Sequence, residues 1–268
     1  MGSNPLVYDG RMEPARQSHP GRIAVLVLLV LGPLAWLLIG HGAPIAQDPG
    51  YHVFADNRTR LGVENFGNVT SNLLFLLAGA AGARECWRHR SGAWRSWLVF
   101  FCGVALVFFG SAYYHGAPGD GTLVWDRLPM TVAFMGLFAA LVSEHLGARF
   151  EYRLLATALA IGVLSVFWWR HSGDLRIYIW VQGAPLLAIP YVTAAFPGRH
   201  THRHYLLYGV GLYALAKAAE LLDHAIYAFT SAVISGHSLK HLLAAAAVFC
   251  VWRMLQHRQS LTPLASSQ

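Results

Sequence analysis

The stretch that organises this chain is WLVFFCGVALVFFGSAYYHGAPGDGTLVWDRLPM, residues Trp97–Met130. It contains one long apolar run, a short loop rich in glycine, and the start of the next apolar run. Ser111 and His115 lie four residues apart, so on a helix they share one face, and Asp126 follows across the loop. We therefore expect a hydroxyl, an imidazole and a carboxylate at the same end of two consecutive apolar helices.

The composition is that of an integral membrane protein. The 268 residues are 55% hydrophobic and 12% charged, and that charged share is roughly half of what soluble domains carry. The formal charge of +7 comes mostly from arginines that lie between apolar runs and do not form one basic face. Membrane topology explains them better than a nucleic-acid partner does. The three cysteines form no metal motif and indicate no disulfide framework.

Apolar runs bounded by charges recur along the whole chain, which predicts an all-α polytopic transmembrane bundle with no separate soluble domain. The first run is too long for the core of a signal peptide and is interpreted as an extra N-terminal helix. The eight runs are Ile23–Ile39, Phe66–Ala83, Trp97–Tyr114, Leu128–Leu146, Leu154–Trp169, Ile177–Phe196, Tyr205–Leu222 and His237–Trp252. The predicted parts are a tail (1–22), the extra helix (23–39), an outer loop (40–65), a seven-helix membrane domain (66–256) and a second tail (257–268).

Eight spans place both termini on one side of the membrane. Most arginines fall on that side, and only Arg58, Arg60, Arg127, Arg170 and Arg176 border the opposite loops. Because positive residues concentrate in cytoplasmic loops, both termini are expected in the cytoplasm. Without an organelle signal, the host membrane is a bacterial inner membrane or an endoplasmic reticulum or Golgi membrane.

A second histidine pair, His237 and His241, repeats the four-residue spacing near the start of the last run. The predicted topology brings it to the same non-cytoplasmic depth as Ser111, His115 and Asp126. Three imidazoles with a hydroxyl and a carboxylate suit a catalytic zinc site, in which a fourth position is left for water. Haem ligation and a proton pathway stay open as alternatives. Haem ligands usually come from facing helices, however, and transporter sites lie nearer the midplane.

Other polar residues are expected to support the site. Three of them follow the spacing i, i+3, i+4 at the start of the second run, so they face neighbouring helices. Ionisable residues near the end of the seventh run are costly in a bilayer and therefore functional candidates, although an ion pair between Lys217 and Glu220 explains them equally well. The supporting candidates are Asn68, Ser71, Asn72, Glu220, Asp223 and Lys240.

Two further expectations concern the outer side and the helix ends. The loop at 40–65 contains acidic residues and could cover the site or hold a hard cation through oxygen ligands, with an ordinary solvated loop as an equal alternative. Four tryptophans close to helix ends are interpreted as an interfacial belt. They are Trp94, Trp97, Trp168 and Trp169.

These motifs together resemble the alkaline ceramidases. The motifs are N-x-x-S-N at Asn68–Asn72, S-x-x-x-H at Ser111–His115 with Asp126 after it, L-P-M at Leu128–Met130 and H-x-x-x-H at His237–His241. The family belongs to a superfamily of seven-helix zinc membrane hydrolases that also includes the adiponectin receptors. The resemblance implies that His115, His237 and His241 bind Zn²⁺ and that Asp126 and Ser111 contact the metal-bound water.

The same resemblance implies hydrolysis of a linear amide in a membrane lipid: ceramide, phytoceramide or dihydroceramide would yield a sphingoid base and a fatty acid. A hydrolase of another lipid amide or ester, and a non-catalytic zinc-containing receptor, remain alternatives. The oligomeric state is not indicated.

The chain also departs from the family pattern. Arg127 stands where members commonly have an acidic residue, and Asn65 replaces a second acidic residue that helps to hold Ca²⁺ in animal members. This replacement weighs against a calcium site built from Asp56, Asn57 and Glu64. The helix at 23–39 is additional to the seven-helix core.

Overall fold

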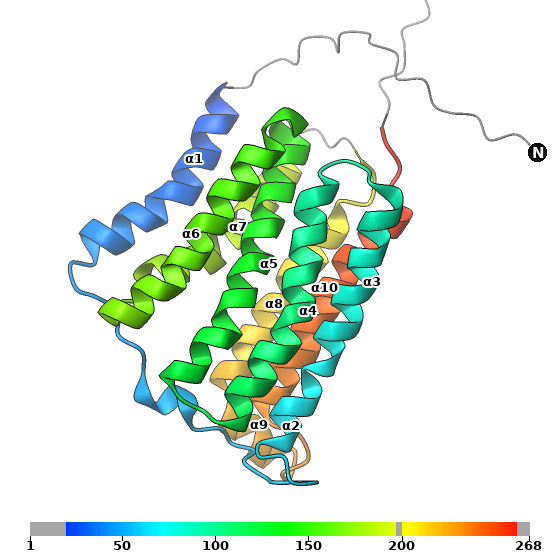
Figure 1. Ribbon diagram of the computed structural model, residues 1–268. Coiled ribbons are helices and arrows are strands. Elements are labelled where there is room, and N and C mark those ends of the chain that lie inside the picture. The colour runs from blue at the N-terminus through cyan, green and yellow to red at the C-terminus, as the bar shows by residue number, and fades with distance from the viewer. Residues whose placement is uncertain (1–19, 197–199, 262–268) are drawn as a thin grey trace, which may run out of the picture.

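The computed structural model describes residues 20–196 and 200–261, and these form a long helical bundle (Figure 1). The predicted tails fall largely on residues 1–19 and 262–268, which lie outside the described residues. In the described part the chain forms helices and two isolated β-bridges, and no strand. The predicted all-α class is therefore confirmed.

Every predicted apolar run forms helix, because a backbone in a bilayer has to satisfy its own hydrogen bonds. The helices are α1 (Pro20–Ala35), α2 (Phe66–Ser71), α3 (Leu73–His89), α4 (Trp94–Gly116), α5 (Asp120–Leu146), α6 (Glu151–Ser172), α7 (Arg176–Ala195), α8 (His204–Leu221), α9 (Asp223–Phe229) and α10 (Gly236–His257). Short helical turns occur at Trp36–Gly40, Pro49–His52 and Ala148–Phe150.

Among the described residues, seven helical segments are long and apolar enough to cross a membrane. An eighth span results if α8 and α9 are counted together, and these two helices meet at an angle of 82°. The chain is thus a multi-pass membrane protein. The sharp bend at Leu222 was not predicted, since no proline or glycine marks it.

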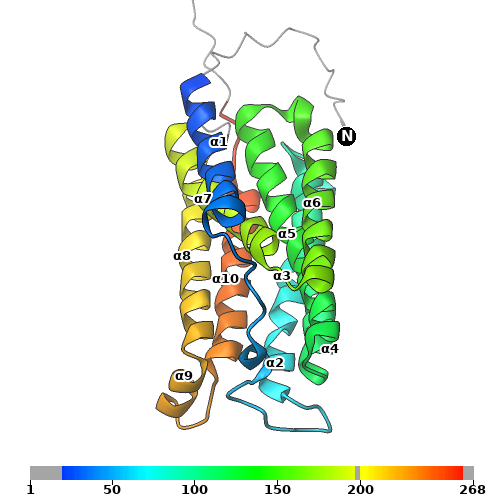
Figure 2. The same ribbon diagram turned by 90° about the vertical axis from the view of Figure 1, so that its left-hand side faces the viewer.

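The bundle is built from neighbours in sequence and closed by its last helix. Helices α3, α4, α5 and α6 pack successively, and α10 returns between α8 and α3. Helix α1 lies outside this ring against α7 (Figure 2). There the Trp180 indole donates to the carbonyl of Val30 at 2.6 Å, and the Tyr191 hydroxyl donates to that of Arg22 at 3.0 Å.

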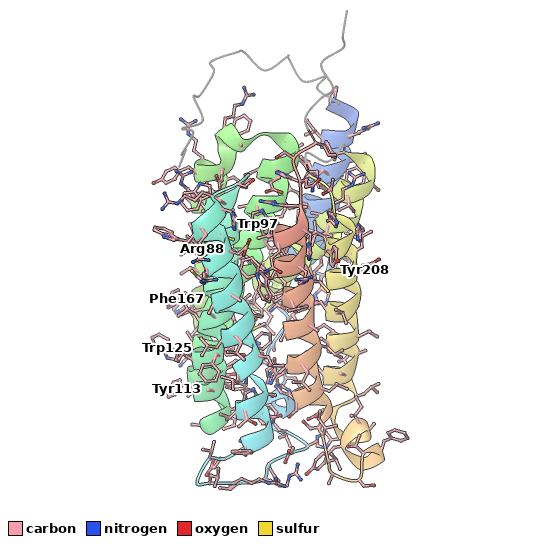
Figure 3. All side chains as sticks on the ribbon, turned by 90° about the vertical axis from the view of Figure 1, so that its right-hand side faces the viewer. Arg88, Trp97, Tyr113, Trp125, Phe167 and Tyr208 are labelled. Atoms are coloured by element: carbon pink, nitrogen blue, oxygen red, sulfur yellow. The ribbon has the colours of Figure 1, made fainter. Side chains whose placement is uncertain are left out.

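The two ends of the bundle differ. The described chain begins and ends at one end, whereas α2 and α9 lie at the other; the 40–65 loop runs from the end of α1 down the side of the bundle to that second end (Figure 1). In Figure 3, Arg88 and Trp97 lie toward the first end and Tyr113 and Trp125 toward the second. This arrangement agrees with an even number of crossings.

The tryptophan prediction is wrong for two of the four residues. Trp97 is buried and its indole donates to Glu144 at 2.8 Å. Trp169 is buried against the guanidinium of Arg127. Trp168, in contrast, is 49% exposed, as a belt residue would be. Adjacent tryptophans point to different sides of a helix, so proximity to a helix end does not determine which one faces lipid.

Candidate functional site

Three buried histidines meet at the end of the bundle that contains the 40–65 loop. His115 lies in the last turn of α4, and His237 and His241 lie in the first two turns of α10. One ring nitrogen from each can be chosen so that all three lie within 4.8 Å of one another. In the described part of the chain, these three side chains form the one group of histidine, cysteine or acidic residues that could hold a metal ion.

Small residues let the helices approach closely at this point. A Cβ atom added to Gly110 would lie 2.0 Å from the carbonyl oxygen of Trp125, so α4 and α5 touch through their backbones beside Ser111 and Asp126. A Cβ atom added to Gly236 would lie 2.2 Å from the carbonyl oxygen of Ala219. Glycine at these positions therefore lets α4 approach α5, and α10 approach α8, at the level of the histidines.

Ser111 and Asp126 lie together next to the histidines. Helix α5 begins at Asp120, earlier than predicted, so Asp126 occupies its second turn and not its start. The Ser111 hydroxyl lies beside the Asp126 carboxylate and interacts with it. Both side chains are buried, and both line the same cavity as His241. The structure thus brings together all five residues that the sequence placed at one depth.

The polar stripe on α2 faces α10 and orients His241. The Ser71 hydroxyl lies 2.8 Å from Nδ1 of His241 and donates to the carbonyl of Asn68 at 3.1 Å. Because its only proton goes to that carbonyl, Ser71 accepts from Nδ1–H, which leaves the Nε2 lone pair of His241 free for a ligand. The Asn68 side chain accepts from the Ser238 hydroxyl at 2.9 Å, and Asn72 lines the cavity.

Charged residues of α8 and α10 form one network beside the cluster. Glu220 accepts from Lys240 at 2.9 Å and also pairs with Lys217. The Lys240 ammonium lies 3.0 Å from Nε2 of His237. The predicted ion pair between Lys217 and Glu220 is therefore present, and it extends through Lys240 to a histidine of the cluster.

Asp223 connects the start of α10 to the outer loop. Its carboxylate accepts from the backbone N–H of His237 at 2.7 Å and from that of Ala55 at 2.9 Å. A buried carboxylate with two backbone donors holds both segments in one register. The structure places Asp223 in a supporting position, without contact to the ring nitrogens.

The outer loop covers the histidines. The Phe54 ring packs against His115 and His237, with ring centroids 4.7 and 4.8 Å away. The Tyr51 hydroxyl donates to Glu220 at 3.3 Å, and burial, followed by the negative charge of Glu220, raises the pKa of Tyr51 well above its ordinary value. Tyr51 is therefore a neutral donor. Sequence reasoning missed both aromatic residues because nothing in their spacing distinguishes them from an ordinary loop.

The proposed calcium ligands are placed differently. Two hydrogen bonds of 2.7 Å from Arg58 reach the Asp56 carboxylate and hold the pKa of Asp56 below its ordinary value. Asn57 and Glu64 are exposed. The Asp56 carboxylate is thus already paired with an arginine, whereas a vacant calcium site would present unpaired oxygen ligands.

A cavity of about 480 Å³ extends from the site along the bundle. Its polar end contains Ser111, Asp126, Arg127, Glu220, Lys240 and His241. The remainder is lined mainly by apolar side chains of α4, α5, α7, α8 and α10, and it reaches Val251. Val251 lies ten residues beyond His241, or about 15 Å along the helix. The cavity therefore has one polar end and a long apolar part.

The family model described as Ceramidase matches residues 62–264. The chain belongs to the Ceramidase family. Its members are hydrolases that act on amide bonds of lipids. A comparison with individual curated proteins returned no match. All three histidines, Ser111 and Asp126 lie inside the matched segment, whereas α1 and the covering residues Tyr51 and Phe54 precede it.

Proposed function

We propose that this Ceramidase-family chain is a zinc-dependent amidase that hydrolyses ceramide, or its phyto- or dihydro- form, to a sphingoid base and a free fatty acid. One observation carries the proposal: Ser111, Asp126 and His241, which belongs to the cluster of three buried histidines, line the polar end of an apolar cavity. A lipid can leave its chains in the apolar part and bring only its amide to the polar groups.

The donor set fits zinc. Three imidazoles form the common catalytic zinc set, with a fourth position open. The buried Nδ1 of His115 has no hydrogen-bond partner among the described residues, and Nε2 of His241 is free. Lys240 donates to Nε2 of His237, and it retains Glu220 as a partner if a metal takes that lone pair. Zinc bound by these residues would lower the pKa of water toward about 7 and polarise the amide carbonyl.

The chain's own residues then supply the proton transfers. Asp126 takes the proton of the attacking water and returns it to the departing amine. The Ser111 hydroxyl, beside the Asp126 carboxylate, orients that carboxylate for the proton transfers. The Lys240 ammonium provides positive charge beside the reacting carbonyl, where low polarity strengthens its effect. The covering loop, through Phe54, excludes bulk water.

The orientation that the arginines indicate, with both termini in the cytoplasm, would place the site at the non-cytoplasmic side. The observation that favours a hydrolase over a non-catalytic receptor is the Ser111–Asp126 pair, because a metal that only stabilises the fold needs no buried base beside it.

The test is fatty-acid release from a ceramide panel by detergent-purified protein, with metal analysis, before and after a chelator and after zinc is restored. Release should disappear with the chelator and return with zinc. His241→Ala should lose zinc and activity together, whereas His224→Ala, which changes an exposed histidine on α9, should keep both. An active His241→Ala variant without zinc would overturn the ligand assignment. A haem absorption band in the purified protein would show that the histidines bind haem and not zinc.

A further inference from the structure

Arg127 is a buried arginine beside the site. Only 4% of it is exposed, and it lines the same cavity as Asp126 and His241. Its guanidinium stacks on Trp169, 3.9 Å from the ring centroid, and on Tyr178 at 4.5 Å. Two aromatic faces therefore hold this cation in one position at the end of the cavity.

This guanidinium forms no direct ion pair with a carboxylate in the described part of the chain, although its charge acts on the neighbouring Asp126. One nitrogen, Nη2, donates to the neutral amide oxygen of Gln47, and the buried Nη1 has no hydrogen-bond partner. The preceding residue, Asp126, interacts with this charge but forms no ion pair with it. Other arginines of this chain have carboxylate partners, in the pairs Arg58–Asp56, Arg176–Asp174 and Arg258–Glu144. Arg127 is thus a buried cation with no carboxylate in direct contact and with one nitrogen that has no hydrogen-bond partner.

A buried charge without a direct ion pair is costly, and contact with an anionic ligand reduces that cost. The guanidinium presents a planar fork of donors that matches a carboxylate or phosphate. Gln47 and Tyr51 place Arg127 at the loop end of the cavity, opposite the apolar part that would hold an acyl chain. The group next to Arg127 is therefore the one on the amine side of the amide.

We propose that Arg127 selects lipid amides whose amine-side headgroup carries an acidic group, a carboxylate or a phosphate. The inference rests on the proposed function for the position of the scissile amide. The inference goes beyond the proposed function because it assigns a substrate class with an anionic headgroup, whereas ceramide is neutral. Arg127 acts here through binding and takes no part in the proton transfers.

The test uses two matched lipid pairs. For binding, N-(hexadecylsulfonyl)serine and N-(hexadecylsulfonyl)serinol differ only in a carboxylate and cannot be hydrolysed as amides. For turnover, dihydroceramide 1-phosphate is compared with dihydroceramide. Purified protein should prefer the acidic member of at least one pair by about 10- to 100-fold, the usual range for charged hydrogen bonds in a buried site.

Three variants test whether Arg127 causes the preference for acidic lipids. Arg127→Gln should bring the ratio close to one. Gln47→Glu keeps Arg127 but gives it a carboxylate partner, so it should also abolish the preference, and as a change in a loop it guards against misfolding of Arg127→Gln. Arg60→Gln, an exposed arginine of the same outer loop, should leave the ratio unchanged.

The outcomes separate the two proposals. Equal treatment of acidic and neutral lipids in both pairs, or a preference that persists in both Arg127→Gln and Gln47→Glu, would overturn the role of Arg127 even if dihydroceramide is hydrolysed. A preference in binding that disappears in these variants, without hydrolysis of any lipid, would support the anion site and refute the amidase.

Discussion

Gly110 determines how closely α4 approaches α5 beside the site, and Gly110→Ala tests that role. The new Cβ would lie 2.0 Å from the Trp125 carbonyl oxygen. Ordinary contact begins at 3.4 Å, so the backbones have to separate by 3.4 − 2.0 = 1.4 Å. Alanine favours a helix by up to about 1 kcal/mol relative to glycine. Overpacking costs about 1–3 kcal/mol, so destabilisation should dominate.

The effect on activity should be larger than the effect on stability. Ser111 follows Gly110 directly and Asp126 follows Trp125, so the separation moves the hydroxyl away from the carboxylate. A displacement of about 1 Å at reacting groups costs about 100-fold in rate. The assay is ceramide hydrolysis, with zinc content and thermal unfolding measured on the same sample. Gly121→Ala is the control, because nothing lies within 4 Å of its added Cβ. A Gly110→Ala variant with the wild-type rate would refute this account of the α4–α5 contact.

Three other perturbations have defined outcomes. Ser71→Ala removes the acceptor of His241 Nδ1–H and should weaken zinc binding by about 10- to 100-fold; competition with a chelator measures this, and unchanged affinity would show that the hydrogen bond does not matter. Asp126→Asn should retain zinc and lose turnover, whereas an active variant would remove Asp126 as the base. Arg58 lowers the pKa of Asp56 in the folded protein below 3.8, its ordinary value. The unfolded state therefore binds more protons than the folded state in this pH region. The stabilisation from the Arg58–Asp56 pair should be lost as the pH falls from the unfolded-state pKa to the lower folded-state pKa. Thermal unfolding between pH 3 and 6 checks it: Asp56→Asn should remove this part of the pH dependence, and an unchanged curve would contradict the assignment.

Much of the architecture could be predicted because a membrane restricts it. Apolar runs of this length have to be helices, and counting them predicts which ends meet. His115 and His237 could be assigned to one depth for that reason alone. The weaker predictions were those that depend on rotation about a helix axis. Trp97 and Trp169 were placed toward lipid, whereas both are turned inward to Glu144 and Arg127.

The sequence by itself determined the helical bundle, the shared depth of the histidines and the identity of the polar residues around them. It did so through periodicity and hydropathy, which act within one segment. Only the tertiary structure decided that Ser71 faces His241, that Phe54 covers the cluster and that Arg127 is buried without a direct ion pair. These contacts join segments far apart in the chain. They depend on backbone approaches such as that at Gly110, and on a bend at Leu222 that no local pattern marks.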